Sequence, residues 1–451
     1  METVNLTTAD HLISEEEALN LIESAIKQSQ AEGVFVSLDA EESALSRFSE
    51  NQISQNIHKN RFSLTVTSYF GRRSASASTT ELDPEAIAQV VRRSEALARF
   101  APEDPEWVEL LSPQTYEPRT PAFDRPTSEL SPLARGEIIR QVCSLSQQAG
   151  VNGSGTLSTR LSLNAIGNSL GLRGCDRTSE ADFSFTARQD NGSNWNRSTA
   201  WSVEQLPIQE LTSKTIEKAI ASRHPRDIEP GDYTVILEPA AMSSLLPWVI
   251  WNLDARAADE GRSFMSRRDE LGQPVGNRVG EQLFSPILQV YREPAHPLLQ
   301  SGRFFSDGLP NNYLEIVKNG IPQTLSYSRY WAKKQDQQPT GAMYPLVMTG
   351  SDRSVTDLIS NTERGILVSR AWYVRYVNPR TLEVTGMTRD GTFAIADGQI
   401  AYPIKNLRFN QGLPQMLQNL EAVSTPQRCG SSVIPGCKVN NFHFSSITDS
   451  I

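Results

Sequence analysis

The sequence has few of the residues that bind transition metals or close disulfide frameworks. Its 451 residues include five His and four Cys. The Cys residues are widely separated, at Cys143, Cys175, Cys429 and Cys437. In a chain of this length such spacing does not indicate a disulfide framework, and a reducing cytoplasm is the expected compartment.

The five His residues do not form a metal-binding pattern. They are His11, His58, His224, His296 and His443. No two of them have the helical spacing that places side chains on one face, and none is followed by Glu. A hydrolytic zinc needs three protein ligands and an open position for water. We therefore expect each imidazole to be solvated or packed in the core.

Long apolar runs and an excess of basic charge are also missing. No uninterrupted apolar run approaches the roughly 20 residues of a membrane helix. The start, METVNLTTADHLISEEE, lacks a basic region followed by an apolar core, so no signal peptide is expected. The formal net charge of −9 disfavours binding to nucleic acid or its phosphate backbone. The composition, with 38% apolar and 21% charged residues, is typical of a globular protein.

The first part of the chain predicts a helix, a set of strands and a second helix. Ser14 and Glu17 have the spacing of a capping box, and an apolar stripe follows up to Gly33, which is expected to end the helix. Alternating residues then predict strands that include 34–38 and 62–69. The second helix is expected to open at residues 83–84, with an acidic cap and Pro in its first turn.

The same order of elements returns further along the chain. The expected elements are a helix over 131–149, strands near 157–163 and 181–187, and a closing helix over 208–222. Asn51 follows Val34 by 17 residues, and Asn168 follows Val151 by the same number. These matches predict a duplicated α/β unit, with the Pro-rich stretch 101–132 as its linker.

From Gly231 onward the sequence indicates mainly β structure. Asn-Gly and Asp-Gly pairs at 319–320 and 397–398 stand inside alternating runs, which favours hairpins, and the pair at 390–391 is expected to lie between strands. Two helical patterns interrupt this half, at about 240–260 and 354–364. We predict an antiparallel curved sheet or open barrel with a helix packed against it.

The predicted fold class is therefore α+β. A duplicated N-terminal α/β unit precedes a β-rich C-terminal domain. The expected boundaries are 1–115 for the N-terminal domain, 116–228 for the central domain that repeats it, and 229–451 for the C-terminal domain.

The segment 235–264, VILEPAAMSSLLPWVIWNLDARAADEGRSF, carries the strongest resemblance to a known family. Further motifs follow in order along the chain: RVGEQLFSP (278–286), DGLP (307–310), SRYWAKKQ (328–335), NPRTLEVTGMTRDGTF (378–393) and YPIKNLRFN (402–410). Together they resemble the TldD/TldE (PmbA) family, also called modulators of DNA gyrase, and in particular its TldE-type branch. The label modulator of DNA gyrase suggests DNA binding, and the acidic net charge gives that interpretation no support.

The resemblance implies that a zinc site is missing from this chain. TldD-type members carry an HExxxH helix, and the corresponding positions here are about Pro247, Trp248 and Asn252. A third ligand in the family is the Cys of a Cys-Gly pair, which matches Cys429 and Gly430. We therefore expect no catalytic residue and no bound metal or other cofactor, with Cys429 as a vestigial, buried thiol.

Other polar side chains near this segment allow only weaker hypotheses. The carboxylates of Asp254, Asp259 and Glu260 are expected to form a solvated helix face, because they do not pair at helical spacing. Candidates for a peptide cleft are Arg262, Ser263 and Phe264. Arg262 could hold a carboxylate or a carbonyl group, or could pair with a nearby acid. The aromatic pairs at 330–331 and 372–373 are expected to form one cluster, which suits a core or a subunit interface, where Trp and Tyr are enriched.

By the resemblance, the chain is expected to be a non-catalytic TldE-type subunit of a heteromeric TldD/TldE zinc metallopeptidase that acts on unfolded or short leader peptides. Its partners would be a TldD-type subunit, which holds the zinc, and the peptide substrate, with no nucleic acid or membrane. Two alternatives stay open: an autonomous hydrolase with a non-standard site, and a peptide-binding regulatory module. A homodimer of the chain alone is also open.

Overall fold

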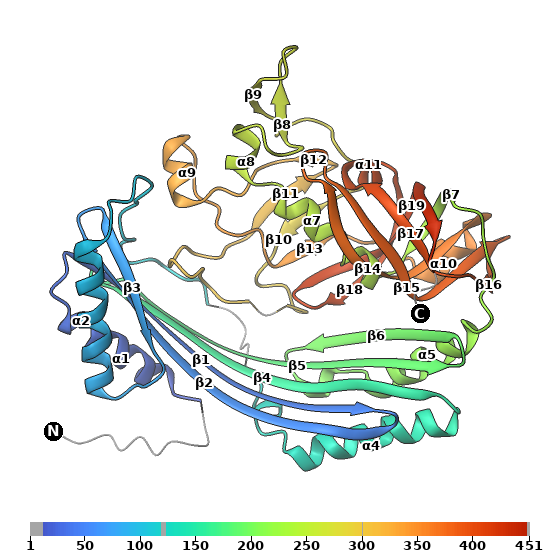
Figure 1. Ribbon diagram of the computed structural model, residues 1–451, viewed down its shortest axis with the longest axis horizontal. Helices are drawn as coiled ribbons and strands as arrows, with labels where there is room; N and C mark the ends of the chain where they lie inside the picture. The colour runs from blue at the N-terminus through green and yellow to red at the C-terminus, as the bar shows by residue number, and fades with distance from the viewer. Residues whose placement is uncertain (1–11, 119–122, 300, 449–451) are drawn as a thin grey trace.

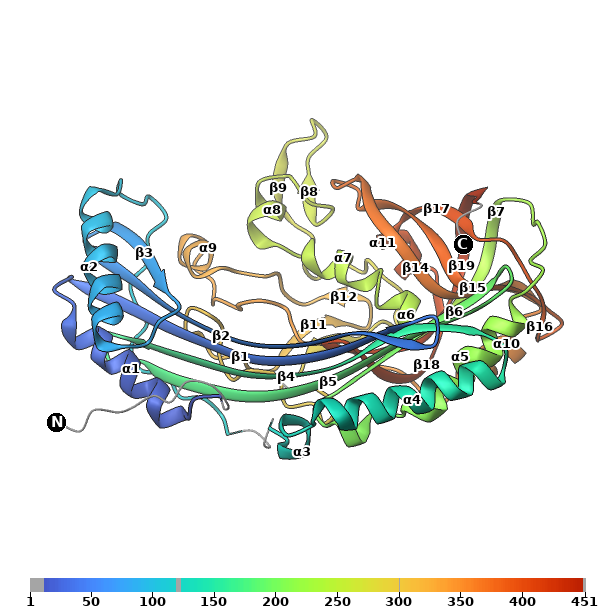
Figure 2. The same ribbon diagram turned by 60° about the horizontal axis from the view of Figure 1, so that its bottom comes forward.

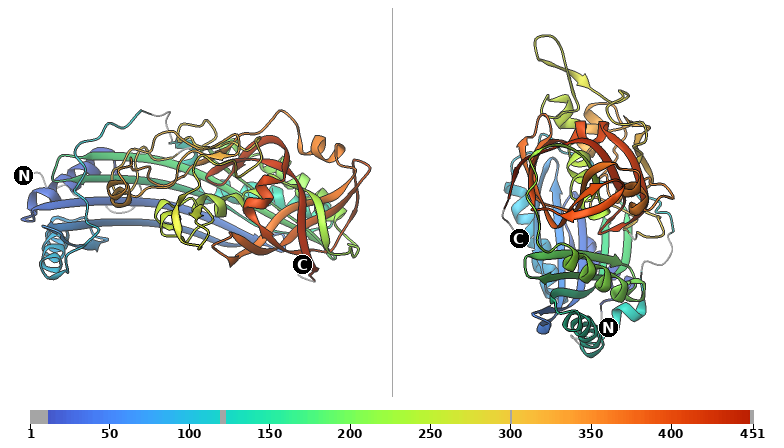
Figure 3. Two further views of the ribbon diagram at one scale, coloured as in Figure 1. Left: turned by 90° about the horizontal axis from the view of Figure 1, so that it is seen from above. Right: turned by 90° about the vertical axis from the view of Figure 1, so that its right-hand side faces the viewer.

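A computed structural model describes residues 12–118, 123–299 and 301–448 of the chain. His11 lies outside the described residues. Two sheets dominate the architecture, one from each half of the sequence, and the molecule is elongated along the strands of the first (Figures 1 and 3). No helix within the described ranges is long and apolar enough to cross a membrane.

The N-terminal half forms one six-stranded antiparallel sheet of long, curved strands. Its order is β3-β2-β1-β4-β5-β6. The strands are β1 (Gly33–Ser49), β2 (Gln52–Phe70), β3 (Arg73–Thr79), β4 (Asn152–Asn168), β5 (Arg173–Gln189) and β6 (Gly192–Ala200). The helices are α1 (Glu15–Gln28), α2 (Pro84–Phe100), α3 (Arg125–Ser128), α4 (Pro132–Gln148) and α5 (Ile208–Ala221), with a short 3₁₀ helix η1 (Val203–Gln205).

Helix α1 starts where the sequence predicts and ends earlier. The Glu17 N–H donates to Ser14 Oγ at 3.2 Å, and the Ser14 N–H donates to Glu17 Oε2 at 2.8 Å, which confirms the capping box. The prediction that Gly33 ends this helix is wrong. Ser29 already has extended backbone and ends the helix, and Gly33 opens β1. Asp83 caps α2 as expected.

The strands are much longer than the sequence pattern indicates. β1 has 17 residues and β2 has 19, whereas only 34–38 and 62–69 were expected. In β2, residues 52–56 and 58–61 are exposed on both faces, so their side chains show no apolar alternation. Periodicity detects a strand only where one of its faces is buried.

Each half of this sheet repeats the same order: helix, three antiparallel strands, helix. The two copies join where β1 pairs with β4, from Phe35 opposite Asn168 to Phe48 opposite Gly155. The predicted duplication is thus one continuous sheet, and its helices α1, α4 and α5 cover one face while the other face turns toward the C-terminal half (Figure 2). The domain boundaries at 115 and 228 stay a prediction.

The two Asn residues at the same offset have the same kind of role. Asn51 lies in the β1–β2 turn; its Nδ2 donates to Val151 O and its Oδ1 accepts from the Gly153 N–H, both at 2.8 Å. Asn168 closes β4, and its Nδ2 donates to Leu111 O at 2.7 Å. Each Asn therefore ties the tip of one hairpin to a segment outside its own repeat.

The C-terminal half is an eleven-stranded mixed sheet, part of which closes into a barrel. Its strands are β7 (Gly231–Leu237), β10 (Val290–Arg292), β11 (Leu314–Lys318), β12 (Ile321–Pro322), β13 (Leu346–Met348), β14 (Arg364–Asn378), β15 (Glu383–Ala396), β16 (Gln399–Pro403), β17 (Leu407–Gly412), β18 (Leu420–Cys429) and β19 (Ser432–Ile447). The path β7-β14-β15-β17-β19 returns to β7, so the barrel is closed rather than open. The pairings of β7 with β14 and of β13 with β19 are parallel. The α+β class is confirmed.

Two of the three expected turns are hairpin turns and the third is not. Asn319–Gly320 joins β11 to β12, and Asp397–Gly398 joins β15 to β16, all with positive φ. The prediction that residues 390–391 lie between strands is wrong. Asp390 and Gly391 lie inside β15, where the register with β14 shifts, so their positive φ serves a β-bulge.

The prediction of a single helix over 240–260 is also wrong. The segment forms three short helices instead: α6 (Pro239–Met242), α7 (Leu246–Trp251) and α8 (Ala255–Asp259). Pro247 stands in the first turn of α7, and Asp254 caps α8 with an extended backbone. Each of these residues therefore interrupts the preceding helix and begins a new one. Helix α10 (Val355–Ser360) begins after its cap Ser354, where the helical pattern was expected to start, and ends before the expected residue 364. Helices α9 (Arg329–Lys334) and α11 (Leu413–Gln418) were not predicted.

A buried carboxylate at the β15 bulge joins the two sheets. Asp390 is 2% exposed, and its Oδ2 lies 2.9 Å from Arg370 Nη1. From β6, Ser193 Oγ donates to its Oδ1 at 3.3 Å, and Asn194 Nδ2 donates to its backbone carbonyl at 2.6 Å. The bulge therefore presents both the side chain and the main chain of Asp390 to the N-terminal sheet.

The guanidinium of Arg370 is held between two indole rings. Its Cζ lies 3.9 Å from the ring centroid of Trp195 on β6 and 4.2 Å from that of Trp372 on β14. Burial lowers the pKa of Arg370, while the Asp390 carboxylate opposes that shift. The ion pair and the stack together fix the barrel against the end of β6.

We expect Asp390→Ala to lower the free energy of unfolding by about 3–5 kcal/mol, because it leaves a buried guanidinium without its carboxylate. Urea unfolding followed by circular dichroism measures the change. The matched control is Glu137→Ala, which breaks an exposed ion pair with Arg140 and should hardly move the midpoint. Equal shifts for the two variants would contradict a stabilising role of the buried pair.

Candidate functional site

The segment that resembles a zinc-peptidase helix is buried in the core of the C-terminal half. Strand β7 brings Val235, Ile236 and Leu237 into the barrel wall at 1% exposure or less. The next turn and α7 bury Leu246 and Val249 against the same core. The segment is thus mainly an ordinary apolar part of the core. Only a few of its side chains are polar and could take part in chemistry.

A cluster of aromatic rings surrounds the positions that correspond to the metal motif, and Trp248 at one of these positions is part of it. Trp248 packs edge-on against Tyr376 of β14, with ring centroids 4.6 Å apart, and against Trp251 at 5.6 Å. Asn252 Nδ2 donates to Tyr376 Oη at 2.8 Å and to Trp248 O at 2.7 Å. The two amide protons of Asn252 are therefore already bound within this cluster.

These residues do not fit a zinc ion. Pro247 offers no ligand atom, and the indole of Trp248 can only donate. The Asn252 side chain is tied to Tyr376. Across the ranges 12–118, 123–299 and 301–448, no three His, Cys, Asp or Glu side chains come together in a metal-binding group. Zinc chemistry needs at least three such ligands.

Cys429 lies close to the segment, as its place in the family motif implies. It ends β18, and its thiol is within hydrogen-bonding range of the Ser243 hydroxyl, between α6 and α7. Cys429 is half-buried, so the expected buried thiol is met only in part. Desolvation by the surrounding residues raises the pKa of the thiol to about 11. Such a thiol is protonated at neutral pH, whereas metal binding and nucleophilic attack need the thiolate.

The described His residues serve local contacts. His58 pairs with Glu42 at 3.0 Å, and His443 Nδ1 lies 2.8 Å from Asp232. His296 Nδ1 accepts from a backbone N–H at 3.2 Å, and burial lowers its pKa. The backbone of His224 binds Asn191. The structure places no two of these imidazoles in contact with one another.

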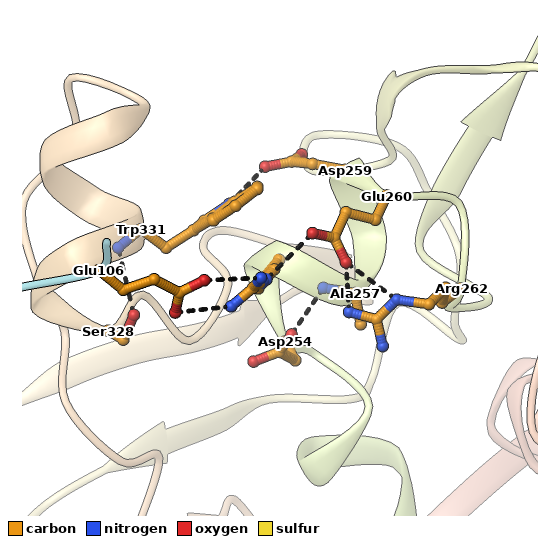
Figure 4. A network of polar contacts seen from close by, with 9 residues as sticks. Glu106, Asp254, Ala257, Asp259, Glu260, Arg262, Ser328 and Trp331 are labelled. Atoms are coloured by element: carbon orange, nitrogen blue, oxygen red, sulfur yellow. Dashed lines mark hydrogen bonds and ion pairs between the residues drawn. The ribbon is translucent and has the colours of Figure 1, made fainter. Parts of the chain in front are cut away.

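The carboxylates after α7 are bound by neighbours (Figure 4). Asp254 Oδ1 caps α8 by accepting the Ala257 N–H at 2.6 Å. Asp259 Oδ2 accepts from Trp331 Nε1 at 2.8 Å. Glu260 lies between two guanidiniums, Arg262 at 2.6 Å and Arg256 at 3.0 Å, which lower its pKa in that order. These acids hold the loop together, and none faces another carboxylate at pairing distance.

Arg256 extends this network to the linker between the repeats. Its guanidinium binds Glu260 at 3.0 Å and Glu106 at 2.9 Å, and both ion pairs raise its pKa, the Glu260 hydrogen bond first. It also lies 5.3 Å from the ring centroid of Trp331. The linker and the C-terminal half are therefore connected beside the candidate site.

The three peptide-cleft candidates differ in access. Ser263 is 4% exposed and donates to Asn252 O at 2.8 Å; Phe264 is 8% exposed and packs toward Phe284. The Arg262 side chain reaches solvent and pairs with Glu260, rather than with Asp259 or Asp307. The geometry gives Ser263 and Phe264 packing roles, and their assignment to a cleft stays a prediction.

The structure separates the aromatic pairs that were expected to form one cluster. Tyr330 and Trp331 pack on each other in α9, with centroids 6.4 Å apart. Trp372 instead stacks on Arg370, and no ring contact joins it to α9 among the residues described. Tyr373 is exposed. Nothing in the sequence indicated a role for Tyr376, because its contact with Trp248 joins strand β14 to helix α7.

Comparisons with known proteins show which family and which fold this chain resembles. Residues 230–446 match the PmbA/TldA metallopeptidase C-terminal domain. The Metalloprotease PmbA of Escherichia coli O157:H7 is 23% identical over 97% of this chain and 98% of its own length. A Metalloprotease PmbA homolog from Haemophilus influenzae is 24% identical over 80% of each chain.

Two solved structures share the whole fold. TldE from Thermococcus kodakarensis has a TM-score of 0.83, 18% identity, and covers 95% of this chain and 100% of its own. A Bacteroides thetaiotaomicron protein described as a candidate modulator of DNA gyrase has a TM-score of 0.84 and 20% identity, with 97% and 100% covered. Residues 230–446 thus carry the C-terminal domain of the PmbA/TldA metallopeptidases. Over nearly its whole length the chain resembles the PmbA metalloproteases and has the fold of TldE.

We expect Cys429 to react slowly with iodoacetamide in the native chain at pH 7.5, and its rate to rise about tenfold per pH unit up to about pH 11. In the urea-unfolded chain the rate should level off near pH 8.5, the ordinary pKa of Cys. Mass spectrometry of the Cys429 peptide measures both rates. Because the folded pKa is the higher one, this thiol also makes stability fall as pH rises from about 8.5 toward 11. A native plateau near pH 8.5 would contradict burial of the thiol.

Proposed function

We propose that the chain is a non-catalytic, TldE-type subunit of a heteromeric TldD/TldE zinc metallopeptidase that acts on unfolded or short peptides. The zinc belongs to the TldD-type partner, and this chain completes the peptide-binding enclosure around it. The observation that carries the proposal is the ring cluster of Trp248, Trp251 and Tyr376, because it occupies the place where the family's metal motif is expected and includes only one of the motif positions, Trp248.

The contacts that stand in place of the metal ligands support a structural rather than a catalytic role for this segment. Asn252 is hydrogen-bonded to Tyr376, and its carbonyl accepts from Ser263, so the loop after α7 is anchored at both of its ends. The apolar frame between Val235 and Phe264 is thereby kept, although no His, Glu or Cys stands at positions 247, 248 or 252. If the geometry of this loop had no function, the specific contacts of Asn252 with Tyr376 and Ser263 would not be needed.

Exposed apolar side chains in and next to the ring cluster support a subunit interface at this place. The exposed fractions are 57% for Trp251, 45% for Tyr376 and 51% for Val377. Large aromatic residues are enriched at the centres of protein interfaces and dominate their energetics. The same surface would meet the zinc-bearing face of a TldD-type chain, which places the catalytic groups in the partner.

Two other functions fit less well. An autonomous hydrolase centred on Cys429 would need a thiolate, and the raised pKa of this thiol argues against one. A regulatory module without a peptidase partner leaves the exposed rings around Trp251 without a role. Native co-purification distinguishes this module from the proposed subunit, since only the subunit retains a TldD-type chain.

Metal analysis and peptide cleavage test the proposal. The purified chain should contain well under one zinc per molecule and cleave no unfolded peptide. Addition of a TldD-type partner should give cleavage that a chelator abolishes. Stoichiometric zinc in the isolated chain, or cleavage by it alone, would overturn the proposal.

A surface variant tests the interface directly. Trp251→Glu should weaken association with the partner by at least about 30-fold, because interface Trp residues commonly contribute 2 kcal/mol or more. The matched control is Phe100→Glu, at a 91% exposed ring on α2 at the far end of the first sheet. Analytical ultracentrifugation of the mixture measures both affinities. Equal affinities for the two variants would place the interface elsewhere.

A further inference from the structure

Two separate apolar cores lie on the helix-covered face of the N-terminal sheet, one for each repeat. On β1, Ala40 belongs to the core that α1 covers, and Phe48 belongs to the core that α4 and α5 cover. Side chains alternate along a strand, so Glu42, Ala44 and Ser46 lie on this same face between the two cores. Two of these three side chains are polar. A polar stretch therefore interrupts the apolar face between the cores of the two repeats.

A cavity of about 460 Å³ lies at this polar stretch. Strands β1 and β4 contribute Ala44 and Leu161, which are buried and apolar, and the segment that leads into α4 contributes Leu130 and Pro132. In Figure 2, α3 and α4 lie beneath this face of the sheet, and the C-terminal half lies on the other side. Ligand sites in proteins have volumes from about 300 Å³ upward and a mostly apolar lining with a few polar groups. The cavity therefore has the size and the kind of lining of a site for a small ligand.

Arg135 of α4 brings a buried positive charge to the cavity, which it lines at 2% exposure. Its Nε donates to Ser46 Oγ at 3.2 Å, and its Nη1 donates to Leu130 O at 2.7 Å. Both acceptors are neutral, and within the described ranges no carboxylate pairs with this guanidinium, whose pKa is lowered by burial. Buried charges are normally paired, as Arg370 is with Asp390. A carboxylate from outside the chain would supply such a pair.

The cavity also contains two carboxylates, and each of them belongs to an ion pair of its own. Glu129 pairs with Arg125 at 2.6 Å. Glu42 pairs with His58 at 3.0 Å, and 17% of the Glu42 side chain is exposed. In the described part of the chain neither acid pairs with Arg135. The cavity is therefore not a general site for anions, because a ligand in it meets negative as well as positive groups.

The two kinds of charge belong to opposite ends of the cavity. Arg135 is held at Ser46, and Glu42 precedes Ser46 by four residues on β1, which is about 13 Å of strand. Ala44 lies between them as an apolar floor.

We infer that the cavity binds a small zwitterion with separated charges, such as a dipeptide, whose carboxylate meets Arg135 and whose ammonium group meets Glu42. A guanidinium binds a carboxylate through two parallel hydrogen bonds, which fixes that end of the ligand. A phosphate dianion would be repelled by Glu42. The inference does not rest on the proposed subunit role, because it involves neither the ring cluster nor the C-terminal half.

Titration calorimetry of the chain alone with the dipeptide Ala-Ala tests this inference. Ala-Ala should bind saturably. N-acetyl-Ala-Ala lacks the ammonium group and Ala-Ala amide lacks the carboxylate, so each should bind at least about tenfold more weakly, the usual loss for a charged hydrogen bond. Free alanine carries both charges on one carbon atom and cannot reach both ends of the cavity, so it should lose about as much. Inorganic phosphate should show no saturable binding.

Variants at the two ends locate the ligand. Arg135→Met removes the guanidinium and should lower the affinity for Ala-Ala at least about tenfold. Glu42→Gln keeps a hydrogen-bonding group for His58 but no charge, so Ala-Ala and N-acetyl-Ala-Ala should then bind equally. The matched control is Arg140→Met, at an exposed Arg of the same helix, which should bind within about twofold of the unchanged chain. Circular dichroism checks the folding of each variant, and Glu42→Gln decides alone if Arg135→Met does not fold.

Any of four results would overturn the inference. They are no saturable binding of Ala-Ala, equal binding of Ala-Ala and its acetyl or amide form by the unchanged chain, equal affinities of Arg135→Met and Arg140→Met, and tighter binding of phosphate than of Ala-Ala. The test uses no partner subunit and no zinc. Its failure would therefore leave the proposed subunit role untouched, and the reverse also holds.

Discussion

The antiparallel pairing of β1 with β4 is the contact on which the rest of the molecule depends. It merges two copies of one α/β unit into a single sheet, with one face for the helices and the other for the C-terminal half. It also sets the position of β6 at the margin, where Ser193 and Asn194 bind the bulge at Asp390. Without that pairing, the surface against which the barrel packs would not exist.

The sequence predicts those parts of this architecture that depend on local chemistry. Ser14 and Asp83 start helices where capping residues require it, and Asn319–Gly320 makes the expected hairpin. The rest depends on tertiary contacts. The polar half of β2 carries no periodic signal because neither of its faces is buried. The positive φ at Asp390–Gly391 looks like a turn in sequence, although the partner strand makes it a bulge.

The candidate site shows the same division. The absence of His and Glu from the segment around Pro247 is visible in the sequence, and so is the thiol at Cys429. What replaces the ligands could not be read there, because Tyr376 is more than a hundred residues away from Trp248. Loss of two imidazoles from a core would leave space and unpaired polar groups. The rings and the bond from Asn252 to Tyr376 remove both costs.

The stack around Arg370 gives the molecule a property beyond its rigidity. Two of the seven Trp residues lie on opposite sides of the contact between the sheets, Trp195 on β6 and Trp372 on β14, with a cation between them. Indole emission depends on nearby charge and on contact with water. The share of the intrinsic fluorescence that Trp195 and Trp372 contribute therefore changes when the two halves separate, and it can be read without any label.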